Sequence, residues 1–195
     1  MDMVYFNENH LRIVDDALVL AEQIASDYYK LSSTDWKNAP YDVRTLKDLT
    51  SEEIVAGVFA QVARYRQDPA KSPSGRGRYE FYKICLHDHQ ILKATNGGRG
   101  IALFPLLLYV LTHELVHIVR FKRFLHRFHA SEQERTGEET RVHRTTSEIL
   151  RAVPVSGIDP VLRNYEGHAG LFGSGLGGVW TRSDSTEQSI GELQL

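Results

Sequence analysis

A single cysteine, Cys85, occurs in the chain of 195 residues. The chain therefore cannot form an intramolecular disulfide or a four-cysteine zinc site. Positive and negative side chains are also nearly balanced, because the formal net charge is −2 with histidine counted as neutral. This balance argues against a globally basic nucleic-acid-binding protein, so nucleic acid is not an expected partner.

Long apolar segments are also lacking. The longest apolar run, residues 101–111, is too short to cross a bilayer and contains Pro105, so it predicts a buried helix. The first residues have neither the basic start nor the continuous apolar run of a signal peptide. We therefore expect a cytoplasmic protein without a membrane-spanning segment. No pattern in the sequence indicates an oligomeric state.

Apolar residues recur at three- and four-residue steps over much of the chain, as in amphipathic helices. The expected helices cover residues 8–31, 51–66, 105–129, 131–152 and 159–165. Thr50 and Ser131 each begin a capping-box pattern, in which a glutamate follows three residues later. Proline, glycine and polar residues predict a connector over 32–49 and a surface loop over 67–78.

Aromatic and β-branched residues are concentrated ahead of the helix predicted over 105–129. Tyr79–Leu86 is rich in tyrosine, phenylalanine and isoleucine, and Gln90–Thr95 follows after the polar segment His87-Asp88-His89. The pattern predicts a β-hairpin or two short strands. The polar segment between them is expected to be a solvated turn.

Nine histidines are present, and two of them lie in His113-Glu114-Leu115-Val116-His117, an HExxH motif. Residues four positions apart on a helix lie about 40° apart around its axis, so both imidazoles can bind one zinc ion. Glu114 can reach a metal-bound water and serve as the general base. The mostly apolar flanks suit a buried zinc-binding helix. The alternative is a core helix whose histidines form hydrogen bonds only.

A catalytic zinc site needs a third protein ligand. The metzincin pattern requires a glycine and a histidine three and six residues after His117, and this chain has arginines at both positions. A glutamate on the next helix is the other solution, and Glu138 and Glu139 both lie at a suitable distance. We favour Glu139, because His143 follows it by four residues and can help to orient a ligand. Glu138, or His143 itself, is the alternative third ligand.

This arrangement resembles the gluzincin branch of the zincin metallopeptidases, and most closely its small single-domain members, the minigluzincins. The resemblance covers roughly residues 79–145. It implies that His113 and His117 are zinc ligands, that Glu114 is the general base, and that Glu139 takes the place of the glutamate ligand.

Two further expectations come from the same resemblance. In such proteins an edge strand ahead of the HExxH helix pairs with an extended substrate, a role that falls to Tyr79–Leu86 or Gln90–Thr95. Larger gluzincins often have an aspartate four residues after the glutamate ligand. This chain departs from that pattern with His143.

The predicted fold is α+β and mostly helical. It is zincin-like, with helices packed against a small β-sheet or hairpin ahead of the HExxH helix. Residues 1–172 are expected to form one metallopeptidase-like domain, with N-terminal helices in 8–66 and a catalytic core at about 79–152. Residues 173–195 are expected to be a flexible tail.

The predicted function is a zinc-dependent hydrolase, and more specifically a metallopeptidase that acts on a peptide or protein. The alternative is a zinc-binding regulatory or interaction domain without hydrolase activity. The fourth coordination position distinguishes them, because water occupies it in an enzyme and a protein side chain fills it in a structural site. Tyr165 and His168 are the candidates for stabilising an oxyanion, although both residues suit a structural or surface role better.

Overall fold

The computed structural model describes residues 3–67, 79–97, 100–123, 132–165 and 182–183. The helices are α1 (Glu8–Tyr29), α2 (Ser33–Lys37), α3 (Asp88–Thr95), α4 (Leu103–Lys122), α5 (Glu132–Arg151) and α6 (Ile158–Tyr165). The strands are β1 (Tyr41–Arg44), β2 (Ala60–Gln67), β3 (Tyr79–Leu86) and β4 (Arg182–Ser183), and two 3-10 turns are η1 (Leu46–Asp48) and η2 (Ser51–Glu53). The prediction of a mostly helical α+β fold with a small sheet is confirmed.

The strands form one sheet in the order β1-β3-β2-β4. β3 pairs in parallel with β1, with Tyr41 opposite Tyr82, and antiparallel with β2, with Val62 opposite Ile84. The short strand β4 runs parallel to β2 and lies opposite Tyr65 and Arg66 of that strand. β3 is therefore an interior strand. The expectation that Tyr79–Leu86 is a substrate-binding edge strand is wrong, because both of its edges are already paired.

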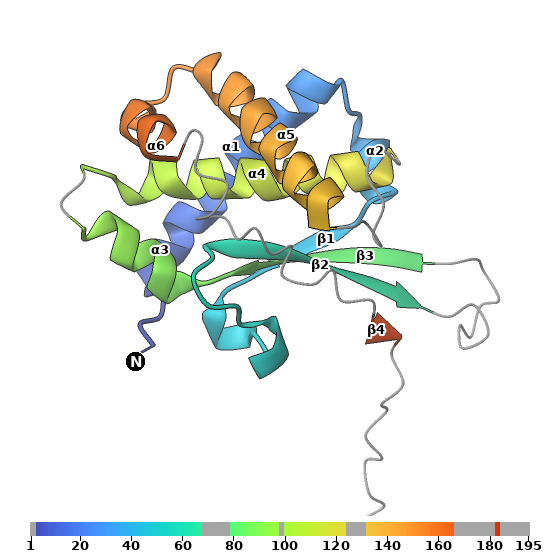
Figure 1. Ribbon diagram of the computed structural model, residues 1–195, viewed down its shortest axis with the longest axis horizontal. Helices are drawn as coiled ribbons and strands as arrows, with labels where there is room; N and C mark the ends of the chain where they lie inside the picture. Colours follow the sequence, from blue (N-terminus) through green and yellow to red (C-terminus); the bar gives the residue numbers. More distant parts are fainter. Residues whose placement is uncertain (1–2, 68–78, 98–99, 124–131, 166–181, 184–195) are drawn as a thin grey trace, which may run out of the picture.

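Helix α4 lies at the centre of the molecule, between the sheet and helix α5 (Figure 1). It contacts α1, α3, α5, α6 and β2. Every residue from Pro105 to Val119 is buried, as expected for a helix that is covered on all sides. The buried helix predicted from the apolar run is thus present. Its position places the HExxH motif inside the core.

Length and apolar composition also qualify α4, among the described helices, as a candidate membrane span. Of its most apolar stretch, 83% is buried within the structure. Core helices of soluble proteins show the same features, so α4 is weak evidence for a membrane span.

The helix predicted over 51–66 is wrong. The capping box at Thr50 and Glu53 forms, but it closes only the single 3-10 turn η2. Gly57 then adopts a positive φ of 81°, which favours glycine and ends any helical path. Residues 60–67 instead form β2, whose inward-facing members share the core with β3. The predicted block of N-terminal helices therefore also supplies strands to the sheet.

Of the two predicted strands, Tyr79–Leu86 is present as β3, whereas the second strand and a hairpin between the two are wrong. Gln90–Thr95 belongs to helix α3, in which the neighbouring residues Ile91 and Leu92 are both buried. Two adjacent buried residues fit a helix face better than a strand that alternates in and out. The connector predicted over 32–49 contains helix α2 and strand β1. β1 is only four residues long and is held by its pairing with β3, which no local pattern reveals.

The remaining predicted helices agree with α1, α5 and α6 within a few residues. Helix α4 ends at Lys122 rather than at His129, and residues 124–131 lie outside the described part of the chain. Residues 68–78 of the predicted loop lie outside the described part of the chain. The predicted tail also lies outside, apart from the two residues of β4.

Candidate metal centre

The HExxH residues lie in the middle of α4. His113 and His117 are one helical turn apart, so their side chains project from the same face. Their Nε2 atoms are 3.1 Å apart, and their ring centroids are 4.8 Å apart. His113, Glu114 and His117 are all buried, because other elements pack around this part of α4. The shared helix face expected from the sequence is therefore present.

The third member of the cluster, Glu139, comes from helix α5. Its Oε1 lies 3.0 Å from Nε2 of His113, and its Oε2 lies 3.2 Å from Nε2 of His117. Only 4% of Glu139 is exposed. Burying an ionised carboxylate is costly unless a cation or hydrogen-bond donors compensate for its lost hydration. The two imidazoles can provide that compensation by donating an N–H, as an imidazolium cation, or by sharing a metal ion with the carboxylate.

The spacing of these donor atoms fits a tetrahedral metal ion. Ligands at 2.0–2.1 Å from zinc are separated by roughly 3.3 Å when the geometry is tetrahedral. The two Nε2 atoms are 3.1 Å apart, and they lie 3.0 and 3.2 Å from the two different oxygens of Glu139, so each of these pairs is close to that value. Imidazole nitrogens and a carboxylate are also the ligands that zinc takes in catalytic sites. The cluster thus suits a metal ion in both donor type and spacing.

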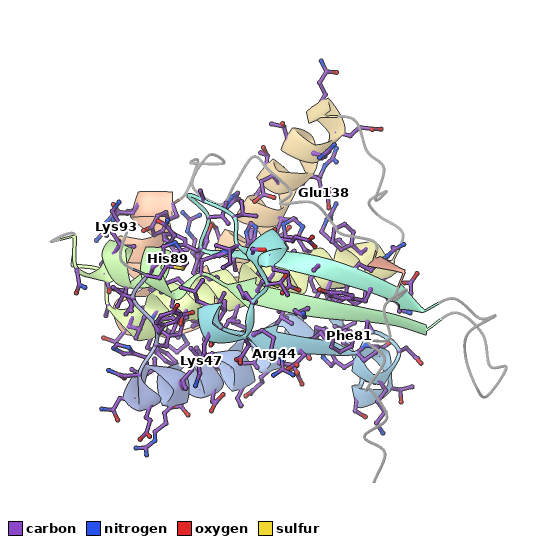
Figure 2. The ribbon with its side chains drawn as sticks, turned by 90° about the horizontal axis from the view of Figure 1, so that it is seen from below. Arg44, Lys47, Phe81, His89, Lys93 and Glu138 are labelled. Carbon is purple, nitrogen blue, oxygen red and sulfur yellow. The ribbon has the colours of Figure 1, made fainter. Side chains whose placement is uncertain are left out.

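Glu138, the rival to Glu139, points to a different partner. Its carboxylate accepts hydrogen bonds from Nε and Nη2 of Arg120, the second over 2.9 Å. Arg141 contributes a more distant contact of 3.7 Å. This ion pair joins α4 to α5. Glu138 is labelled on α5 in the view from below (Figure 2). Glu138 is therefore engaged outside the cluster.

His143 lies beside the cluster, one turn beyond Glu139 on α5. Its Nε2 is 3.2 Å from Oε1 of Glu139, and its Nδ1 is 2.9 Å from the hydroxyl of Tyr109. Among the described residues, His113, Glu139 and His143 form a group whose ligand atoms lie within 4.8 Å of one another, close enough to hold one metal ion. His143 is thus either a further ligand or a neighbour that orients Glu139.

Burial and charge act in opposite directions on the two motif histidines. Burial lowers the pKa of His113 to about 3 although the Glu139 carboxylate opposes this. Burial would also lower the pKa of His117, but Glu139 outweighs it and the pKa is raised. The same two histidines hold the pKa of Glu139 below its ordinary value against the effect of its own burial. Without a metal ion, the carboxylate of Glu139 therefore favours the protonated form of His117.

Glu114 lies in the same buried region with its carboxyl group near the cluster. Burial raises the pKa of Glu114 to about 8, while the charge of His117 lowers it and the charge of Glu139 raises it. A divalent cation at the cluster would favour the ionised form of this carboxyl group. A pKa near neutrality is suited to a group that accepts and returns a proton.

Tyr109 was not identified from the sequence as a site residue. It is fully buried on α4, one turn before His113, and it is the only phenol in that apolar helix. The sequence feature that could have identified Tyr109 is a hydroxyl within an apolar run, because a buried hydroxyl needs a hydrogen-bond partner. Tyr165, a candidate for oxyanion stabilisation, is buried with its ring against Phe59 and Tyr109. His168 lies outside the described residues.

The segment His87-Asp88-His89 is not a solvated turn. Nε2 of His87 accepts a hydrogen bond from the amide of Val55, and the carboxylate of Asp88 accepts bonds from two distant amides. His87 and Asp88 are both buried. His89 lies well to one side of Glu138 in Figure 2. The segment therefore has a structural role, apart from the cluster.

The described residues bring His113, His117 and Glu139 together, with Glu114 nearby and with Tyr109 and His143 behind the carboxylate. Comparisons with protein-family models, with curated proteins and with solved structures found no match for this chain.

Proposed function

We propose that this protein is a zinc-dependent hydrolase of the metallopeptidase type. The observation that carries the proposal is the meeting of Glu139, from a separate helix, with both histidines of an HExxH motif at 3.0 and 3.2 Å. A histidine pair alone is common in helices. A buried carboxylate beside both Nε2 atoms completes the set of three protein ligands that a catalytic zinc ion takes.

His113, His117 and Glu139 would hold the ion. Zinc bound by three protein ligands lowers the pKa of a coordinated water and polarises a carbonyl oxygen. Glu114 would accept a proton at its carboxylate and return it to the leaving amine. Burial raises the pKa of Glu114 to about 8 in the metal-free protein, and a divalent ion at the cluster would lower it toward the range in which a carboxyl group both accepts and returns a proton.

The zincin-like fold belongs to the same proposal. Its support is the order of elements, in which an antiparallel strand pair precedes the HExxH helix and a glutamate-bearing helix follows it. In the described sheet β2 also lies between two strands, so the substrate-binding edge would be the outer side of residues 60–64 of β2, beyond the two positions that face β4. β2 contacts α4, and its described partner on the outer edge, β4, lies opposite only Tyr65 and Arg66. The substrate would be an extended segment of a peptide or protein.

A second candidate function has one specific observation in its favour. His143 is close enough to His113 and Glu139 to share a metal ion with them. Four protein ligands would close the coordination sphere and exclude a reactive water. The protein would then be a zinc-binding regulatory or interaction domain without hydrolase activity.

Metal content and peptidase activity test the proposal together. Protein purified without added metal should contain about one zinc ion per chain by elemental analysis. Glu139→Ala should lose the ion and the adjacent Glu138→Ala should keep it, which makes the second variant a matched control. Glu114→Gln should keep zinc but lose hydrolysis of a mixed peptide library. Absence of zinc from the wild type, with no uptake of added zinc, would overturn the proposal.

A further inference from the structure

We propose that Arg64 makes the hydrolase selective for substrates with an acidic side chain at one position of the extended segment that pairs with β2. The inference rests on the proposed function and names the class of its substrate. Strand β4 lies opposite Tyr65 and Arg66, so position 64 is the last residue of the outer edge that a substrate would occupy. A cation therefore marks one end of this edge.

Arg64 lies on the face of the sheet that is turned toward α4. Successive residues of a strand point to opposite faces, so Arg64 shares a face with Ala60 and Val62. These positions lie opposite three residues of β3 that belong to the same core as α4, namely Leu86, Ile84 and Tyr82. Helix α4, which carries the HExxH motif, contacts β2 and covers this face (Figure 1). The guanidinium is thus on the same side of the sheet as the metal cluster.

The guanidinium of Arg64 is buried, with 4% of the residue exposed. On the side of β3, its Nη2 lies 3.7 Å from Oε1 of Glu80, which is longer than a hydrogen bond. A guanidinium has five N–H donors, and these can serve more than one carboxylate. Opposite charges attract each other more strongly in buried surroundings than in water. A substrate carboxylate that arrives from the outer side of β2 would therefore be bound firmly.

The geometry of strand addition brings such a carboxylate to Arg64. A peptide that adds to the outer edge forms main-chain hydrogen bonds with β2, and its side chains alternate between the two faces. Residues directly opposite on neighbouring strands share a face, with Cβ atoms about 4.5–5.5 Å apart. An aspartate or glutamate opposite Arg64 can then form two parallel hydrogen bonds with the guanidinium. The contact is made within the extended sheet, so it does not require Arg64 to be exposed to solvent.

The other positions on this face define the rest of the substrate class. Ala60 and Val62 are apolar, so the substrate residues opposite them should be apolar as well. Only alternate residues of the substrate face α4. Read along β2 from position 60 to position 64, the preferred segment is therefore apolar, unrestricted, apolar, unrestricted and acidic.

Peptide libraries that differ only in aspartate or asparagine at one position test the inference. The wild type should show a kcat/KM about 10- to 100-fold higher for the aspartate library at one position, the size expected for a hydrogen bond between charged groups. Arg64→Gln should lose this preference, and Arg64→Glu should prefer lysine there. Glu80→Gln removes a competing carboxylate and should increase the preference. Arg44→Gln removes a cation of β1 that is 49% exposed and is the matched control.

Equal kcat/KM for the two libraries at every position would overturn the inference and leave the hydrolase function standing. Circular dichroism checks that each variant is folded. Arg64→Gln adds no charge to the core, so it decides the question if Arg64→Glu does not fold.

Peptide binding gives a readout that does not need hydrolysis. The probes are labelled peptides with valine at alternate positions and aspartate or asparagine at one end, made in both chain orders. Fluorescence anisotropy on Glu114→Gln should show about tenfold tighter binding of the aspartate peptide, and adding Arg64→Gln should abolish the difference. Equal binding of the two peptides would overturn the inference. A clear difference in binding, with no library cleaved by the wild type, would instead refute the proposed hydrolase function.

Discussion

Arg120 and Glu138 join helices α4 and α5 through a pair of hydrogen bonds, in which Nε and Nη2 of the arginine reach the two carboxylate oxygens. Successive residues on a helix are about 100° apart around its axis. With Glu138 held at Arg120, the next residue, Glu139, is turned toward the histidines of the motif. The ion pair thus separates the roles of two adjacent and chemically identical side chains.

Removal of Arg120 should destabilise the protein more than removal of the whole pair. Arg120→Leu takes the nearest cation away from the carboxylate of Glu138, which is 1% exposed, at a cost of about 3–5 kcal/mol. Arg120→Leu combined with Glu138→Leu removes the buried charge as well and should recover most of that loss. Urea denaturation of the wild type, Arg120→Leu, Glu138→Leu and the double variant measures the coupling energy between the two side chains. A double variant whose loss equals the sum of the losses of the two single variants would show that the pair contributes no coupling energy.

Zinc binding should weaken as the pH falls. Glu139 raises the pKa of His117 above its ordinary value, whereas burial alone would lower it, so a proton must leave His117 before the ion binds. For one proton released, the apparent dissociation constant rises about tenfold for each pH unit below that pKa. Calorimetry in buffers of different ionisation enthalpy counts the protons. Binding without proton release near neutral pH would contradict the assignment of a proton to His117.

Glu53 should stabilise the fold in a pH-dependent way. Burial would raise its pKa, but hydrogen bonds from Lys83, Tyr65 and the amide of Thr50 lower it to about 2. The carboxylate therefore contributes fully above its unfolded pKa of 4.5, and the contribution is lost as the pH falls toward 2. At neutral pH it is on the order of 3 kcal/mol.

The comparison with Glu53→Gln isolates this contribution. The variant should be less stable than the wild type at pH 7, and the difference should shrink as the pH falls from 5 to 2. Urea denaturation at several pH values gives the two free energies of unfolding. A difference that stays constant over this range would mean that the ionised carboxylate does not favour the folded state.

Asp88 should be essential to the packing of the N-terminal segment. Its carboxylate accepts hydrogen bonds from the amides of Phe6 over 2.8 Å and Leu46 over 3.0 Å. Asp88→Ala leaves two amides without this acceptor, which should cost about 2–4 kcal/mol. Asp88→Asn keeps one acceptor oxygen and should cost about half as much. Hydrogen exchange should speed up at Phe6 and Leu46 in Asp88→Ala, and unchanged exchange at both amides would refute the role.

Local geometry explains which elements could be predicted from the sequence. A helix is held by hydrogen bonds between residues four positions apart, so its periodicity is written into the sequence, as for α1, α4 and α5. The shared face of His113 and His117 follows from the same geometry. A strand needs a partner that is distant in sequence, and β1 and β2 depend on β3 for theirs. For that reason β1 was not predicted and residues 60–67 were mistaken for a helix.

The sequence by itself determined the two histidines on one helix face, the glutamate between them, and the apolar residues that bury them. Only the tertiary structure decided which carboxylate meets those histidines, because that choice depends on how α5 is rotated against α4. The contact of Arg120 with Glu138 is one of the long-range interactions between these two helices. The position of Tyr109 behind His143 was decided in the same way, by the packing of two helices whose sequences do not encode their relative orientation.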